Sequence, residues 1–180
     1  MMDFGAMNAQ KTNKKIQLLP FHVSERIAAG EVIERPASVV KELVENSLDA
    51  KATEVMVILD NGGKDLIEII DNGHGMSAKD LALSAKRHAT SKLSTLEDLE
   101  KIKTLGFRGE ALASINAVAK LEITSTQIHS TKAYEWTNLP NQEEQLKAIT
   151  FGHYLTSEHG TKIKVESLFA QVPARLKFLK

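Results

Sequence analysis

The first candidate for chemistry is a stripe of three polar side chains, Glu42, Asn46 and Asp49. Their spacing of four and then three residues places them on one face of a helix. Most polar stripes on amphipathic helices only face solvent. The residue types allow a second interpretation, because a carboxylate can act as a base toward water. An amide oxygen one turn away is a hard ligand of the kind that Mg²⁺ takes alongside phosphates and waters.

A second candidate is the segment Asp71-Asn72-Gly73-His74-Gly75-Met76, which directly follows a strand-like run. Asp, Asn and Gly are the commonest turn residues, so an ordinary turn at a strand end is one interpretation. The functional interpretation is that the two glycines let backbone approach a flat ligand closely. A buried carboxylate there can accept a hydrogen bond from an exocyclic amine such as that of adenine.

The third candidate, Gly106-Phe107-Arg108-Gly109-Glu110-Ala111, places a glycine turn ahead of a helix. The free N–H groups and the dipole at the start of a helix favour phosphate, although the same residues can simply cap the helix. No GxxxxGK[ST] phosphate loop occurs in the sequence. The six histidines are scattered and form no zinc-binding motif.

Composition limits the other classes of function. The 180 residues contain no cysteine, which excludes disulfides, thiolate metal sites and cysteine nucleophiles and fits the reducing cytosol. The 23 basic and 23 acidic residues balance, so net charge gives no attraction to nucleic acid or anionic lipid. No apolar run approaches the length of a membrane span. We expect a cytoplasmic protein without membrane contact.

Several secondary-structure elements can be located from periodicity. Pro36 and the apolar positions after it predict a helix over about 36–50. Strands are expected at about 54–60 and 65–70, joined by a tight turn at Asn61-Gly62-Gly63. Two capping boxes, Ser77 with Asp80 and Ser94 with Glu97, predict short helices, the second of which ends at Gly106. The remaining expected elements are a helix at 111–119, strands near 121–126 and 161–168, a strand that carries Tyr134 and Trp136, and a basic amphipathic tail at 174–180.

The length and the 42% hydrophobic content suit one compact α/β domain. Residues 1–15 are polar and aperiodic, so we expect a mobile arm at 1–15 and a single domain over 16–180.

Three motifs together resemble the ATP-binding motifs of the GHKL superfamily, which contains gyrase-type topoisomerases, heat-shock chaperones, histidine kinases and MutL: NSLDA at 46–50, DNGHGM at 71–76 and GFRGEAL at 106–112. Longer matches at 27–50, 87–93 and 105–115 are similar to the MutL branch. The resemblance implies an α/β (α+β) two-layer sandwich, the GHKL or Bergerat fold, with a mixed, mostly antiparallel sheet covered on one face by helices.

The resemblance also implies roles for individual residues. Glu42 is expected to be the general base, Asn46 the Mg²⁺ ligand and Asp71 the partner of the adenine amine, with Thr161 beside it. Residues 77–106 are expected to form a lid over the phosphates. The expected ATP-binding residues are Asn46, Asp49, Asp71, Gly73, Gly75, Met76, Thr90, Ser91, Lys92, Gly106, Phe107, Arg108, Gly109, Glu110, Ala111, Leu112 and Thr161.

The implied function is a slow Mg²⁺-dependent ATPase that acts as a switch in DNA mismatch repair. The implied partners are a mismatch-recognition protein, a downstream repair nuclease or helicase, DNA bound mostly outside this chain, and a second copy in a nucleotide-dependent homodimer. A second domain of the family supplies a lysine to the terminal phosphate, so we expect weak or no hydrolysis by this chain alone. The family pattern LFYNTPAR is altered at Ala170-Gln171-Val172, and the roles of those polar groups are not carried over.

Two alternatives use the same pocket. A histidine-kinase-like phosphotransferase has no need for a water-activating base, so Glu42 argues against it. A non-hydrolysing interaction scaffold would keep the fold with an inactive pocket, and the intact set of Glu42, Asn46 and Asp71 argues against that.

Overall fold

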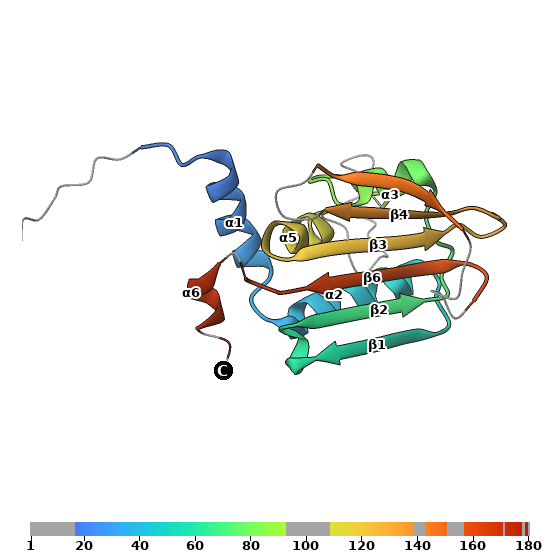
Figure 1. Ribbon diagram of the computed structural model, residues 1–180, viewed down its shortest axis with the longest axis horizontal. Coiled ribbons are helices and arrows are strands. Elements are labelled where there is room, and N and C mark those ends of the chain that lie inside the picture. The colour runs from blue at the N-terminus through green and yellow to red at the C-terminus, as the bar shows by residue number, and fades with distance from the viewer. Residues whose placement is uncertain are drawn as a thin grey trace, which may run out of the picture.

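The computed structural model describes residues 17–92, 109–138, 143–150, 157–170, 172–177 and 179. The expected arm at 1–15, the helix predicted from Ser94 and Glu97, and its end at Gly106 lie outside these residues. The described part forms two layers, with a sheet on one side and helices packed against one of its faces (Figure 1).

The sheet has six strands in the spatial order β1-β2-β6-β3-β4-β5. Their bounds are β1 Val55–Asp60, β2 Leu66–Asp71, β3 Lys120–Thr126, β4 Ala133–Asn138, β5 Gln145–Ile149 and β6 Gly160–Glu166. Every neighbouring pair among these strands is antiparallel. The predicted two-layer α/β sandwich is therefore confirmed, and the described sheet contains none of the parallel pairing that a mixed sheet allows.

Helices α2, α3 and α5 begin close to where the sequence signals predict. Their bounds are α1 Phe21–Val32, α2 Pro36–Asp49, α3 Ala78–Ser84, α5 Ala111–Val118 and α6 Pro173–Leu176. Pro36 opens α2 because its fixed φ suits a first helical position that needs no N–H donor. Ser77 caps α3 by accepting a hydrogen bond from the Asp80 backbone N–H, which confirms the first capping box. α1 and β5 were not predicted.

The turn between β1 and β2 is a short 3-10 segment, η1 Asn61–Gly63, in which Gly62 has a φ of 63°. It confirms the predicted hairpin. The segment predicted as a basic amphipathic tail begins within a short helix: Pro173 opens the four-residue α6, and Arg175 Nη1 donates to the Ile33 carbonyl at 3.3 Å. Among the described residues, no helix has both the length and the apolar character required to cross a bilayer.

The core lies between the helices and the covered face of the central strands. Alternate residues of β2, β6 and β3 point into it, and the apolar ones are Ile67, Ile69, Ile163, Val165, Leu121 and Ile123. Each such side chain stabilises the fold by about 1.5–3 kcal/mol through burial. At one end of the three strands this alternation continues with polar residues, because Asp71, Thr161 and Ser125 lie directly opposite one another in register. The fold therefore places a row of three buried polar side chains at the edge of the apolar core.

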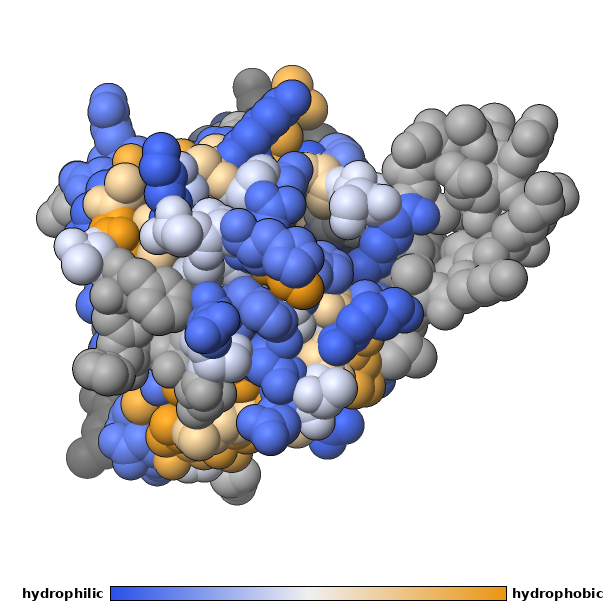
Figure 2. Space-filling view, turned by 90° about the vertical axis from the view of Figure 1, so that its right-hand side faces the viewer, coloured by the Kyte–Doolittle hydropathy of each residue, from blue (hydrophilic) through white to orange (hydrophobic). Residues whose placement is uncertain are grey.

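The opposite, open face of the central strands carries charged residues that include Glu68, Lys162 and Lys164, and β1 forms one edge of the sheet. Figure 2 views the molecule from the end of the sheet that lies on the right in Figure 1, and the side of the molecule seen there is mostly hydrophilic. Hydrophobic residues gather at its lower edge, on the side where β1 lies, and the exposed apolar residues of β1 are Met56, Val57, Ile58 and Leu59.

Candidate functional site

The centre of the candidate site is the carboxylate of Asp71, the last residue of β2. Only 5% of Asp71 is exposed. Its Oδ2 accepts a hydrogen bond from Ser47 Oγ of α2 at 2.9 Å, and its Oδ1 accepts one from the Gly73 N–H at 2.9 Å. The two bonds fix the orientation of the carboxylate, because its two oxygens are held from different sides. Its remaining acceptor capacity can serve a ligand.

The loop after Asp71 is held against two other elements. A Cβ on Gly73 would lie 2.8 Å from both the Cβ and the carbonyl oxygen of Ala50, and the His74 N–H donates to that carbonyl at 2.9 Å. Gly75 has a φ of 66°, and a Cβ there would lie 1.9 Å from the Thr126 carbonyl oxygen. These contacts give both glycines a packing reason, which adds to the predicted role of making room for a nucleotide.

Three residues that the sequence interpretation missed complete the surroundings of Asp71. Ser47 holds its carboxylate, and Ser125 contacts the hydroxyl of Thr161 at 3.0 Å. His159 precedes β6, and its Nδ1 lies 2.7 Å from the Gly73 carbonyl oxygen. The sequence could have indicated the two serines. Each occupies a position where the periodicity of its helix or strand places a buried side chain, and each has a hydroxyl there in place of an apolar group.

The polar stripe of α2 forms a second part of the site. Lys92 brings two of its members together: its Nζ donates to Asn46 Oδ1 at 2.9 Å and to Asp49 Oδ2 at 2.6 Å. Glu42 lies one turn earlier, is one third exposed, and has an Oε1 3.9 Å from Lys41 Nζ. Its partial exposure leaves the carboxylate accessible to water. The structure therefore places the predicted base and the predicted metal ligand on the same face of α2.

The arrangement of Asn46 and Asp49 fits a cation. Their oxygens converge on one ammonium nitrogen, so both can face a single positive centre. Mg²⁺ prefers oxygen ligands and keeps waters and phosphates in its shell, so one or two protein oxygens suffice. Among the described residues, no group of three or more His, Asp or Glu side chains could hold a metal ion by itself.

Ala89, inside the predicted lid, lies against Gly109, just before α5. Gly109 has a φ of 63°, and a Cβ there would lie 2.6 Å from the Ala89 carbonyl oxygen. Thr90 Oγ1 accepts a hydrogen bond from the Lys92 N–H at 3.1 Å, while Ser91 is exposed. The predicted contacts at Gly106, Phe107 and Arg108 fall on residues outside the described ranges.

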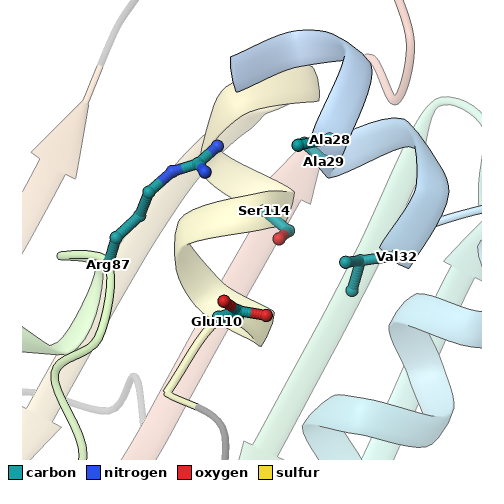
Figure 3. Close-up of a pocket in the computed structure, with 6 residues that line it drawn as sticks. All are labelled: Ala28, Ala29, Val32, Arg87, Glu110 and Ser114. Atoms are coloured by element: carbon teal, nitrogen blue, oxygen red, sulfur yellow. The ribbon is translucent and has the colours of Figure 1, made fainter. Parts of the chain in front are cut away.

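Other predicted residues have structural contacts in the described chain. Met76 and Leu112 are partly buried and pack against the core, and Ala111 is the first residue of α5. Glu110 precedes α5, and its Oε1 lies 3.8 Å from His88 Nδ1. It also lines a small pocket of about 50 Å³ with Arg87, Ser114 and three residues of α1 (Figure 3). That volume is far below the several hundred Å³ of typical ligand sites, so this pocket does not hold a nucleotide.

A model of the family described as histidine kinase-, DNA gyrase B- and HSP90-like ATPase matches residues 33–162, a range that runs from before Glu42 to Thr161. The chain belongs to this ATPase family. Within the family it is similar to MutL. It is 52% identical to the DNA mismatch repair protein MutL of Bradyrhizobium diazoefficiens over 165 residues, which are 92% of this chain and 26% of that protein. It is 51% identical to MutL of Shewanella baltica over 92% of this chain and 25% of that protein.

Solved structures of the family agree with these sequence matches. The Aquifex aeolicus MutL ATPase domain complexed with ADP is 35% identical with a TM-score of 0.56, over 83% of this chain and 49% of that one. The N-terminal domain of a DNA repair protein is 32% identical with a TM-score of 0.63, over 86% of this chain and 42% of that one. The predicted GHKL fold and the resemblance to MutL are confirmed. The chain spans about a quarter of the length of the curated relatives it matches.

Proposed function

We propose that this chain binds ATP with Mg²⁺ and serves as the ATPase switch of a MutL-type DNA mismatch repair protein. The observation that carries the proposal is the buried Asp71 carboxylate, oriented by Ser47 and Gly73 and aligned with Thr161 across the β2–β6 pair. The two hydrogen bonds to Asp71 offset part of the cost of burying its carboxylate, and its remaining acceptor sites match the exocyclic amine of adenine. Membership of an ATPase family supports this assignment.

The residues of α2 serve the phosphate end of the nucleotide. Asn46 holds the metal, with Asp49 beside it, because their oxygens already converge on one cation. When bound, Mg²⁺ neutralises charge on the phosphates. Glu42 accepts a proton from the attacking water, and its position one turn from Asn46 places base and metal ligand on one face. Transfer to water needs positioning and charge neutralisation rather than a covalent nucleophile.

Lys92 has two positions in this proposal. In the nucleotide-free protein its ammonium pairs with Asn46 and Asp49. With ATP bound, Lys92 would contact the phosphates together with Thr90, Ser91 and residues 106–111, which would leave the oxygens of Asn46 and Asp49 available to hold Mg²⁺. Binding of nucleotide and binding of metal are then linked through one side chain, since the triphosphate attracts the lysine away from the metal ligands.

The proposed role in the whole protein follows from the relatives named MutL. ATP binding promotes dimerisation of two such domains and signals to a mismatch-recognition protein and to a repair nuclease or helicase. Contacts with DNA lie mostly outside this chain, because its charges balance. Hydrolysis by this chain alone is slow, and the protein acts in the cytoplasm at the nucleoid.

The test is calorimetric titration with a non-hydrolysable ATP analogue, with and without Mg²⁺. We expect binding by the wild type that weakens at least about tenfold in Asp71→Asn, because the amide presents a donor where the amine needs an acceptor. In Asn46→Ala we expect binding to lose its dependence on Mg²⁺. Glu68→Gln, the same change of type on the open face of β2, serves as the matched control and leaves affinity unchanged.

Two outcomes contradict the proposal. The first is no binding by a wild-type chain that unfolds cooperatively on heating, which favours the scaffold alternative. The second is equal affinity in the wild type, Asp71→Asn and Glu68→Gln, which places the nucleotide elsewhere on the molecule.

A further inference from the structure

Ser125 lies at a position in the candidate site where its hydroxyl contacts several other groups. It is fully buried near the end of β3, and its Oγ has three polar neighbours. The Met76 N–H donates to it at 2.8 Å, the Gly160 carbonyl oxygen lies at 3.0 Å, and Thr161 Oγ1 lies at 3.0 Å. The three neighbours belong to the Asp71 loop and to the start of β6, so Ser125 connects three parts of the pocket.

The protons available to these groups allow only one complete arrangement. A serine hydroxyl has one proton to donate and two lone pairs to accept with. The Gly160 carbonyl can only accept, and the Met76 N–H can only donate. Ser125 must therefore donate to Gly160, and the remaining contact is a hydrogen bond only if Thr161 donates to Ser125. In the reverse arrangement the Ser125 oxygen and the Gly160 carbonyl would face each other without a proton, which is unfavourable in a buried position.

This arrangement determines what the Thr161 hydroxyl can offer on the side that faces Asp71. Its single hydroxyl proton is committed to Ser125, so the oxygen offers only lone pairs in other directions. Asp71, its register partner, also offers acceptors. At this end of the site, the Thr161 and Asp71 oxygens therefore both act as acceptors toward a base.

We propose that Ser125 is a positioning residue that sets the base specificity of the site by holding the proton of Thr161. An acceptor-only surface pairs with the exocyclic amine of adenine and repels the carbonyl oxygen that guanine carries at the same position. This inference rests on the proposed ATP binding and adds the reason why guanine is rejected.

The experiment compares the affinities of non-hydrolysable ATP and GTP analogues, measured by calorimetry on the same protein preparations. The wild type is expected to prefer the ATP analogue. In Ser125→Ala the Thr161 proton is released and can turn toward a carbonyl, so the ratio of the two dissociation constants is expected to fall about tenfold, the effect of one hydrogen bond. Ser125→Cys, whose thiol fills the space but is a weak partner, carries the same expectation if Ser125→Ala does not fold.

A double variant separates this role from a general loosening of the pocket. Ser125→Ala/Thr161→Val lacks the Thr161 hydroxyl that could donate to guanine. The higher affinity for the GTP analogue that is expected in Ser125→Ala should therefore disappear in the double variant. Ser114→Ala removes another buried hydroxyl, on α5, and is expected to keep the wild-type ratio.

The possible failures are distinguishable. An unchanged ratio in folded Ser125→Ala, with the wild type binding ATP, overturns the role of Ser125 alone. The same relaxed ratio in the double variant also overturns it, because the effect then does not pass through Thr161. A folded wild type that binds neither nucleotide overturns the proposed function together with this inference.

Discussion

Lys92 contributes the positive charge that the structure places against the α2 stripe. Its side chain is 19% exposed and that of its partner Asp49 is 12% exposed, so the pair is shielded from solvent more than a surface ion pair. The ammonium occupies the point at which the Asn46 and Asp49 oxygens converge. A divalent cation that uses these oxygens must therefore displace it.

We expect Lys92→Gln to change the response of the nucleotide-free chain to Mg²⁺. Loss of the charged hydrogen bonds should lower the free energy of unfolding by about 2 kcal/mol. Mg²⁺ should then raise the melting temperature of the variant more than that of the wild type, because the two oxygens are open. Thermal unfolding in MgCl₂ and in NaCl of matched ionic strength measures the difference.

The control is Lys86→Gln, which removes a lysine paired with Glu144 at 2.5 Å, away from the α2 stripe. Its Mg²⁺ response should equal that of the wild type. An equal response in all three proteins would show that Lys92 and the metal do not compete.

The residues of the site were predictable to different degrees. Asp71, Asn46 and the glycines belong to short motifs of recognisable chemistry, and the structure places Asp71 and Thr161 directly opposite each other as expected. Ser125 could be recognised as a buried hydroxyl, but its contact with Thr161 could not be predicted, and His159 was not found, because these contacts depend on strand register and on a loop distant in the chain. Register is a property of strand pairing, and a single strand does not reveal it.

At the scale of elements, the loop after β2 owes its shape to close packing at Gly75. Its φ of 66° is one that residues with a side chain rarely adopt, and the Thr126 carbonyl fills the space where a Cβ would lie. Gly62 in η1 has nearly the same φ, 63°, but nothing lies within 4 Å of its Cβ position. A substituted residue would meet the same backbone strain at both positions, but only at Gly75 would its Cβ also clash with a neighbour. The two positions therefore form a matched pair for comparing the cost of substitution.

We expect Gly62→Ala to cost about 1 kcal/mol, the strain of a left-handed backbone alone. Gly75→Ala should cost about 3 kcal/mol or more, since the loop must also move away from β3. Urea unfolding of both variants gives the two values. Equal decreases in the free energy of unfolding would mean that the loop moves without cost and that its contact with Thr126 does not determine its shape.

The elements themselves were mostly predictable. Helix α2, the hairpin of β1 and β2, the cap of α3, and strands β3 and β6 follow from local signals such as Pro36, the turn glycines and period-two alternation. Helix α1 and strand β5 were not predicted. β5 has only five residues, QLKAI, whose polar and apolar types alternate too briefly for a clear strand signal, and four of the five are exposed.

On the scale of the whole molecule, charged rows cross the open face of the sheet. Glu166 of β6 accepts hydrogen bonds from Lys120 of β3 at 2.5 Å and from Lys164 at 2.9 Å. The hydrogen bond from Lys120, followed by that from Lys164, lowers the pKa of Glu166 below its ordinary value. A carboxyl whose pKa is lower in the folded state stabilises the fold above its unfolded pKa of about 4.3, and this contribution is lost as pH falls through the folded pKa.

We therefore expect Glu166→Gln to lower the free energy of unfolding by about 0.5 kcal/mol at neutral pH, the usual size for a partly exposed ion pair. The difference from the wild type should shrink below about pH 4.3 and in high salt. Denaturant unfolding at several pH values checks this, with Glu34→Gln, an exposed carboxylate away from the sheet, as control. A difference that is constant with pH would contradict the electrostatic origin.

The position of β6 has a consequence for how the protein is made. Among the described strands it is the last in the chain, yet it lies between β2 and β3 (Figure 1). During synthesis Asp71 and Ser125 emerge first, and Thr161 can join them only when β6 inserts between their strands. Contacts between residues so far apart form slowly. The buried row of Asp71, Thr161 and Ser125 is thus completed only after β6 has inserted. A nucleotide that required all three residues would bind only chains with β6 in place, and it would stabilise them by mass action.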